Sequence, residues 1–125
     1  MTAVIIDSDV LIEVFRAKDT KILDRWAALI ASNTVVLYSP VTVAEVWHGA
    51  RPSEHSATSA LFSALICSPI DEAVGKQAGE YLARYAKSHH LELGDALIAS
   101  AATRYPAQLW TRNRKHYPMT DVEFY

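Results

Sequence analysis

A short apolar run near the start of the chain, Ala3 to Ile6, is rich in β-branched side chains and stops abruptly at Asp7. Such a run is typical of a strand that is buried on both faces of a sheet. From Ser8 onward, apolar residues recur at helical spacing, and Ser8 is the expected N-cap of this helix. A strand that leads directly into a helix is the first half of a βαβ unit.

The same alternation of strand and helix patterns continues along the chain. Further strands are expected at residues 35–38, 65–67 and 109–111, with a possible edge strand at 122–125, and helices at 20–30, 42–49, 56–65, 71–90 and 94–105. Strands that alternate with helices imply parallel pairing and helices on both faces of the sheet. We therefore predict an α/β fold, a single-domain α/β/α sandwich with a mostly parallel central sheet.

Length and composition narrow the classes of protein that remain. With 125 residues, 50% of them hydrophobic and 21% charged, the chain suits one folded domain and not a disordered segment. Its net charge of −2 excludes a global positive field that attracts nucleic acid, so any such contact has to be local. One cysteine, no leader-like start and no long apolar run lead us to expect a soluble, cytoplasmic protein without membrane contact. The tryptophans, Trp26, Trp47 and Trp110, are expected in the core.

Three acidic residues, Asp7, Glu45 and Asp95, stand in apolar surroundings close to the expected strand ends. Taken singly, each has an ordinary explanation. Asp7 could cap the following helix, Glu45 fits a capping box with Thr42, and Asp95 could stabilise a helix N-terminus. Together they come from successive units whose turns meet at one edge of a parallel sheet, where ligands bind. We therefore expect the three carboxylates to lie in one pocket.

A pocket of three carboxylates needs a counter-ion. At a spacing of about 5 Å, each ionised pair would repel by ~3 kcal/mol at an effective dielectric of about 20. Mg²⁺ and Mn²⁺ prefer carboxylate oxygens, and they commonly bind through a few side chains together with substrate phosphate. The pattern therefore predicts that Asp7, Glu45 and Asp95 bind Mg²⁺ or Mn²⁺ and that the site cleaves phosphodiesters.

Four segments of the chain, in order, resemble the motifs of PIN-domain ribonucleases. They are residues 5–12 (IIDSDVLI), 42–46 (TVAEV), 94–99 (GDALIA) and 109–113 (LWTRN). More narrowly, the chain resembles the VapC-type toxins of bacterial toxin-antitoxin pairs, and the resemblance covers almost its entire length. It implies a metal-dependent RNA endonuclease with a PIN-like α/β/α sandwich, usually a homodimer, that is held inactive by a protein antitoxin.

The resemblance also implies roles for individual residues. It makes Asp7, Glu45 and Asp95 the metal-binding and catalytic acids, with Thr111 as the polar residue that supports them. The fourth motif departs from the fullest pattern, because Asn113 replaces an acid and His116 stands where a further aspartate often occurs. An asparagine carbonyl can still orient water or a carboxylate, but it carries no charge, so binding of a second metal ion is left open.

Basic side chains follow the last expected strand. Arg112, Arg114 and Lys115 lie near the expected acidic edge, so we expect them to bind RNA phosphates and to make binding salt-sensitive. Asp9 either supports the site or is an ordinary acid of the first helical turn. Further basic candidates are Arg51 and the cluster Arg84, Lys87, His89 and His90, and for this cluster a solvated surface is an equal alternative.

Other classes of protein share parts of this pattern. Asp7, Ser8 and Asp9 after a strand also fit the first motif of haloacid-dehalogenase-type phosphatases, although the lysine and acidic pair of that class are not well placed. A phosphate-accepting receiver domain needs a lysine after a late strand, and Lys115 fits poorly. A non-catalytic partner-binding module with the same fold is the third alternative.

Overall fold

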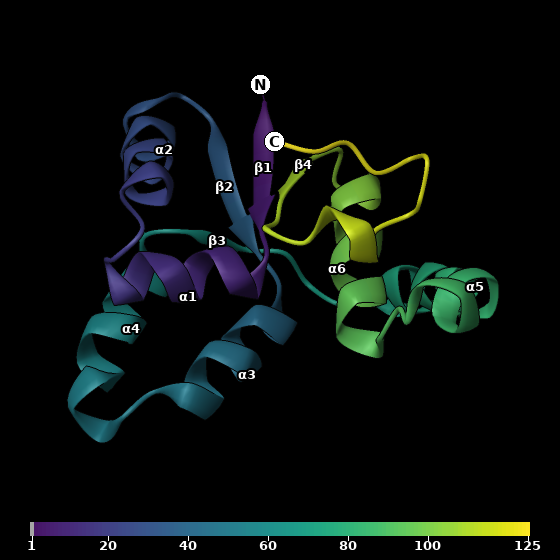
Figure 1. Cartoon of the computed structure of the whole chain (residues 1–125), viewed down its shortest axis with the longest axis horizontal. Coiled ribbons are helices and arrows are strands. Elements are labelled where there is room, and N and C mark those ends of the chain that lie inside the picture. Colours follow the sequence, from purple (N-terminus) through teal and green to yellow (C-terminus); the bar gives the residue numbers. More distant parts are fainter. Residues whose placement is uncertain (1) are drawn as a thin grey trace.

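A computed structural model describes residues 2–125 of the chain (Figure 1), and strands and helices alternate along it as predicted. The elements are β1 (Ala3–Ile6), α1 (Ser8–Arg16), α2 (Thr20–Ala31), β2 (Val35–Tyr38), α3 (Pro40–Gly49), the 3-10 turn η1 (Pro52–Glu54), α4 (His55–Ser63), β3 (Ile66–Cys67), α5 (Glu72–His89), α6 (Leu93–Arg104), β4 (Gln108–Trp110) and the 3-10 turn η2 (Arg114–His116). No helix in residues 2–125 has the length and apolar character that crossing a membrane requires.

The strands form one parallel sheet in the order β3-β2-β1-β4. The chain leaves β1 toward β2 and β3 on one side and returns to β4 on the other side. The strand order therefore reverses between β1 and β4, and open parallel sheets bind ligands beyond the carboxyl ends of the strands at such a reversal. Asp7 follows β1 and Thr111 follows β4, so both residues stand at this position.

Each face of the sheet carries its own apolar core. Side chains of a strand alternate between the two faces. Val4 and Ile6 of β1 pack into a core with residues of α1, α2, α3 and α4, while Ile5 packs into a second core with residues of α5 and α6. Figure 1 shows α1, α2 and α4 on one side of the sheet and α5 and α6 on the other. The prediction of an α/β/α sandwich with a parallel sheet is confirmed, and it explains why β1 is apolar throughout.

The N-caps of α1 and α3 differ from the prediction, whereas the starts of the other helices lie within one residue of it. Helix α1 begins at Ser8 and not after it, because Asp7 is the N-cap: its backbone is extended (φ −73°, ψ 155°) and its carboxylate accepts a hydrogen bond from the Ser8 amide. Helix α3 begins at Pro40, before Thr42, because the Ser39 side chain caps it and proline suits the first helical turn.

Two other features of the fold also differ. The expected edge strand near the C-terminus is reduced to a single bridge between Leu109 and Phe124. Trp47 is 38% exposed and stacks on His55, so its assignment to the core is wrong. Trp110 is buried and Trp26 is half-buried against the core, as expected.

Candidate active site

Asp7 is a buried carboxylate at the carboxyl end of β1. Its Oδ1 accepts a hydrogen bond from the Ser8 amide at 2.8 Å. Its Oδ2 accepts one from Thr111 Oγ1 at 2.9 Å and one from the Tyr117 hydroxyl at 2.7 Å. Three donors from three places in the chain therefore fix this carboxylate, and the helix cap expected for Asp7 is one part of its bonding.

Glu45 reaches the same place from α3. Its Oε1 accepts a hydrogen bond from Ser8 Oγ at 2.8 Å, and the Ser8 hydroxyl also lies 3.2 Å from Thr42 Oγ1. The capping box considered for Glu45 is wrong, because Thr42 lies inside α3 and not at its start. Glu45 is the most exposed of the three predicted acids, and its bond to Ser8 directs it toward the end of β1.

Asp95 comes from the first turn of α6 and is partly buried. Its Oδ2 accepts a hydrogen bond from the Glu92 amide at 3.3 Å, so the helix-start explanation for this residue holds in part. Burial raises the pKa of Asp95, and the nearby charge of Asp7 raises it further, against the opposing effect of the Glu92 amide. Asp95 therefore binds its proton more readily than a free aspartate does.

Asp9 carries a buried oxygen without a partner. Its Oδ2 accepts a hydrogen bond from the Arg112 amide at 3.1 Å, whereas its Oδ1 is the only buried side-chain oxygen or nitrogen in residues 2–125 that has no hydrogen-bond partner. Burial, with a further contribution from the charge of Asp7, raises the pKa of Asp9 to about 6. An unpartnered buried carboxylate oxygen costs free energy, so the position of Asp9 is unusual for an ordinary acid of the first helical turn.

These acids line one small pocket of about 150 Å³ at the carboxyl ends of β1 and β4. Its lining residues are Asp7, Ser8, Asp9, Glu45, Asp95, Asn113, His116 and Tyr117. The structure thus brings the three predicted acids together, although they are far apart in the sequence. Within the described residues, no group of three Asp, Glu, His or Cys side chains is already arranged to bind a metal ion. The metal-binding roles of the three acids therefore stay predictions.

The segment after β4 closes the pocket. Thr111 is buried and bonds to Asp7, and its own hydroxyl accepts a hydrogen bond from the Asn113 amide at 3.0 Å. His116 Nδ1 lies 3.9 Å from Asp95 Oδ2. Asn113 and His116 both line the pocket, so the two positions at which the fourth motif departs from its fullest pattern are indeed close to the acids.

Sequence reasoning missed Tyr117. Its hydroxyl lies between two of the acids, 2.7 Å from Asp7 Oδ2 and 3.5 Å from Asp95 Oδ1, and its ring is buried in the core. Burial strongly raises the pKa of the Tyr117 phenol, and the charge of Asp7 adds to this effect, so the phenol keeps its proton. Nothing in the sequence near Tyr117 distinguishes it from an ordinary core aromatic residue.

The predicted RNA-binding side chains do not line the pocket. Arg112 forms an ion pair with Glu13 at 3.2 Å, and Arg114 donates a hydrogen bond to the Tyr125 carbonyl at 3.2 Å. Lys115 is exposed on η2. The other basic candidates lie elsewhere, with Arg51 next to η1 and Arg84, Lys87, His89 and His90 in the second half of α5 and directly after it.

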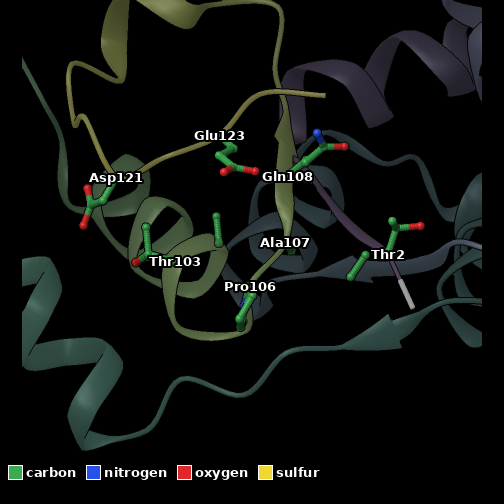
Figure 2. Close-up of a pocket in the computed structure, with 9 residues that line it drawn as sticks. Thr2, Thr103, Pro106, Ala107, Gln108, Asp121 and Glu123 are labelled. Atoms are coloured by element: carbon green, nitrogen blue, oxygen red, sulfur yellow. The ribbon is translucent and has the colours of Figure 1, made fainter.

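A larger hollow of about 390 Å³ lies at the opposite edge of the sheet, near the starts of β1 and β4. Thr2, Gln108 and Glu123 are among the side chains that line it (Figure 2). It contains none of the predicted site residues. In a parallel sheet the amino ends of the strands are not where ligands usually bind, so the smaller acidic pocket is the better candidate for a functional site.

Comparison with known proteins identifies the family. The sequence model of the PIN domain family matches residues 4–121 of this chain. Ribonuclease VapC10 of Mycobacterium tuberculosis (strain CDC 1551 / Oshkosh) is 33% identical over 121 residues, which cover 93% of this chain and 86% of the relative. Ribonuclease VapC19 of the same strain is 34% identical over 94 residues, which cover 74% of this chain and 75% of the relative.

Solved structures share the fold. DNA-bound VapBC from Salmonella typhimurium superposes with a TM-score of 0.82 at 17% identity, covering 100% of this chain and 98% of the other. VapBC-1 from nontypeable Haemophilus influenzae gives a TM-score of 0.78 at 23% identity, with coverage of 99% and 97%. At these low identities, the solved structures are evidence for a shared fold only. Membership of a family rests on the family model and the two sequence relatives, which match most of the chain. The chain therefore belongs to the PIN domain family.

Proposed function

We propose that this chain is a VapC-type endoribonuclease, the toxin of a toxin-antitoxin pair, which cleaves RNA phosphodiesters with Mg²⁺ or Mn²⁺ as cofactor. The observation that carries the proposal is the pocket at the carboxyl ends of β1 and β4. Four acidic residues line it: Asp7, Asp9, Glu45 and Asp95. RNA as the substrate is supported by the names of the relatives, Ribonuclease VapC10 and Ribonuclease VapC19.

The donor groups of the pocket fit a hard divalent cation. They are carboxylate oxygens, which Mg²⁺ and Mn²⁺ prefer, and Asp9 Oδ1 is buried without a partner beside them. Burial and mutual repulsion also raise the pKa of Asp9 and Asp95, a cost that a nearby cation would offset. We propose that Asp7 and Asp95 hold the ion directly and that Glu45 holds it directly or through water. Such an ion lowers the pKa of water and stabilises the charge that develops on phosphate oxygens.

The chain's own residues then orient the reacting groups. Thr111 and Tyr117 fix one oxygen of Asp7, and Ser8 directs Glu45 toward the pocket. The Asn113 side chain lines the pocket and can accept a hydrogen bond from water through its carbonyl, although it adds no charge.

We propose that Arg112, Arg114 and Lys115 bind the RNA backbone at the rim of this pocket. The Arg112 side chain is half-exposed, and Glu13 also pairs with Arg16 at 3.1 Å, so Arg112 can exchange Glu13 for a phosphate without leaving that carboxylate unpaired. Lys115 is exposed on η2, and the exposed Arg114 guanidinium donates to the Tyr125 carbonyl and lies 4.9 Å from the centre of the Phe124 ring.

We further propose that the chain forms one domain, acts in the cytoplasm on RNA, and is held inactive by a protein antitoxin. The antitoxin is supported by relatives of known structure that are VapBC complexes. A homodimer is part of the proposal because the VapC-type toxins that the chain resembles are usually dimeric, and exposed apolar side chains such as Ile66 at 55% and Leu93 at 62% are ones that a second copy could cover. Light scattering on the purified chain tests the dimer, and a monomer at all concentrations would contradict it.

Membership of the PIN family removes the grounds for the haloacid-dehalogenase-type and receiver-domain alternatives. The non-catalytic alternative is separated from the proposal by activity. Purified protein is incubated with RNA in Mg²⁺ or Mn²⁺, and then in EDTA, and we expect cleavage only with the metal.

The variants Asp7→Asn and Asp95→Asn are expected to abolish cleavage while the fold is kept, because each removes a negative charge from the pocket. Asp24→Asn on the exposed side of α2 is the matched control and is expected to cleave RNA like the wild type. Wild-type cleavage rates in Asp7→Asn and Asp95→Asn would refute the mechanism, and a wild-type protein without any cleavage would favour a binding module.

A further inference from the structure

We infer that Tyr117 is a positioning residue of the active site, whose hydroxyl holds Asp7 in the orientation that cation binding requires. This inference rests on the proposed function, because it assigns Tyr117 a part in the same metal-dependent site. It concerns a residue that no sequence motif marks, and it starts from the hydrogen bonds that surround Asp7.

The donors around Asp7 are unevenly divided between its two oxygens. A carboxylate oxygen offers about two lone-pair directions. Oδ2 accepts from both Tyr117 and Thr111, so both of its directions are used. Oδ1 accepts only from the Ser8 amide, so one direction remains free. The tyrosine and threonine hydroxyls thus decide which oxygen of Asp7 is left to face a cation.

Tyr117 can hold this position because its ring does not move freely. The residue is only 3% exposed and packs in the same core as Ala96 of α6 and Met119. Its hydroxyl has one proton, which goes to the nearer acceptor, Asp7 at 2.7 Å, and leaves Asp95 Oδ1 at 3.5 Å as a close neighbour. The ring therefore acts as a rigid spacer between two of the acids.

Packing alone does not require this hydroxyl. A phenylalanine fills the same space in the core and lacks only the oxygen that contacts the acids. Tyr117→Phe therefore separates the positioning role of the hydroxyl from the structural role of the ring. Groups that orient metal ligands through hydrogen bonds typically contribute a factor of about 10 to 100 in metal affinity.

The test is a Mn²⁺ titration of the purified full chain, with free Mn²⁺ followed by electron paramagnetic resonance. For Tyr117→Phe we expect roughly tenfold weaker Mn²⁺ binding than for the wild type. We also expect a similar rise in the Mg²⁺ concentration that half-activates RNA cleavage, with little change of kcat at saturating metal. Tyr105→Phe is the matched control, because its hydroxyl contacts the Pro69 carbonyl at 3.3 Å, away from the acids, and its Mn²⁺ affinity should be unchanged.

The outcomes are distinguishable. Unchanged Mn²⁺ affinity in Tyr117→Phe, with wild-type protein that binds Mn²⁺ and cleaves RNA, overturns the role of Tyr117 and leaves the proposed function intact. Wild-type protein that binds no Mn²⁺ overturns the metal site and this role together. A Tyr117→Phe variant that loses cooperative thermal unfolding also overturns the inference, because the hydroxyl would then be needed for the fold.

Discussion

Replacing Asp9 with asparagine should stabilise the metal-free protein at neutral pH. In the wild type, burial and the charge of Asp7 disfavour the ionised carboxylate of Asp9, and one of its oxygens has no partner. Asparagine removes the charge, keeps a carbonyl oxygen that can accept from the Arg112 amide, and places an NH₂ donor beside the other acids. The substitution therefore relieves an electrostatic cost and loses no essential hydrogen bond.

The size of this effect follows from the pKa of Asp9, which is raised from 3.8 to about 6. At 1.36 kcal/mol for each pH unit, this corresponds to roughly 3 kcal/mol as an upper bound. Asp9 is only partly buried, and solvent screening reduces the gain to about 1 kcal/mol. For a chain of this size, that corresponds to an increase in Tm of roughly 3 to 5 °C.

The sign of the pH dependence follows from the direction of the shift. The folded state holds the Asp9 proton more tightly than the unfolded state, so the wild type loses stability as the pH rises from about 4 to about 6. Asp9→Asn lacks the contribution of Asp9, whereas that of Asp95, whose pKa is also raised, is present in both proteins. The difference in stability between the two proteins should be small near pH 4 and reach its full size above pH 6.

The assay is urea unfolding of the wild type and Asp9→Asn in EDTA at several pH values between about 4 and 8, with Asp24→Asn as an exposed control. Repetition in Mg²⁺ should reduce or reverse the advantage of the variant, because a bound ion stabilises the charged pocket of the wild type. The reasoning would be refuted if Asp9→Asn were less stable than the wild type at pH 7 in EDTA. It would also be refuted if the gain in stability were the same at every pH.

Three further predictions concern the core, the pocket and the basic rim. Leu109→Ala should destabilise the protein by about 2 to 5 kcal/mol in urea unfolding, because Leu109 is fully buried in the central sheet; a loss below 1 kcal/mol would contradict its place in the core. Ser8→Ala removes the donor that orients Glu45 and should lower the RNA cleavage rate by about tenfold or more at a cost of about 1 kcal/mol in stability; unchanged kinetics would show that this bond has no functional part. Alanine at each of Arg112, Arg114 and Lys115 should reduce the slope of log affinity against log salt by about 0.7 per lost phosphate contact, measured by fluorescence anisotropy with single-stranded RNA; an unchanged slope would place the RNA elsewhere.

The sequence by itself determined the order of the elements and the edge at which the acids meet. Apolar runs such as Ala3–Ile6 are typical of strands buried on both faces of a sheet, and the helical patterns between them favour parallel connections. Once the sheet is parallel, the ends of its strands share one edge, and this places Asp7 there. Glu45 and Asp95 reach the same edge from α3 and from the first turn of α6, so their arrival depends also on how these helices pack.

Only the tertiary structure decided which partners these acids have. Thr111 is 104 residues from Asp7 and Tyr117 is 110 residues away, yet both donate to the same oxygen. The bond of Ser8 to Glu45, the ion pair of Arg112 with Glu13 and the exposure of Trp47 likewise depend on how the helices dock. Hydrophobic periodicity reports which face of an element is buried, but a hydrogen bond needs atoms placed to within a few tenths of an ångström. That precision is set by packing between distant segments, and no local pattern encodes it.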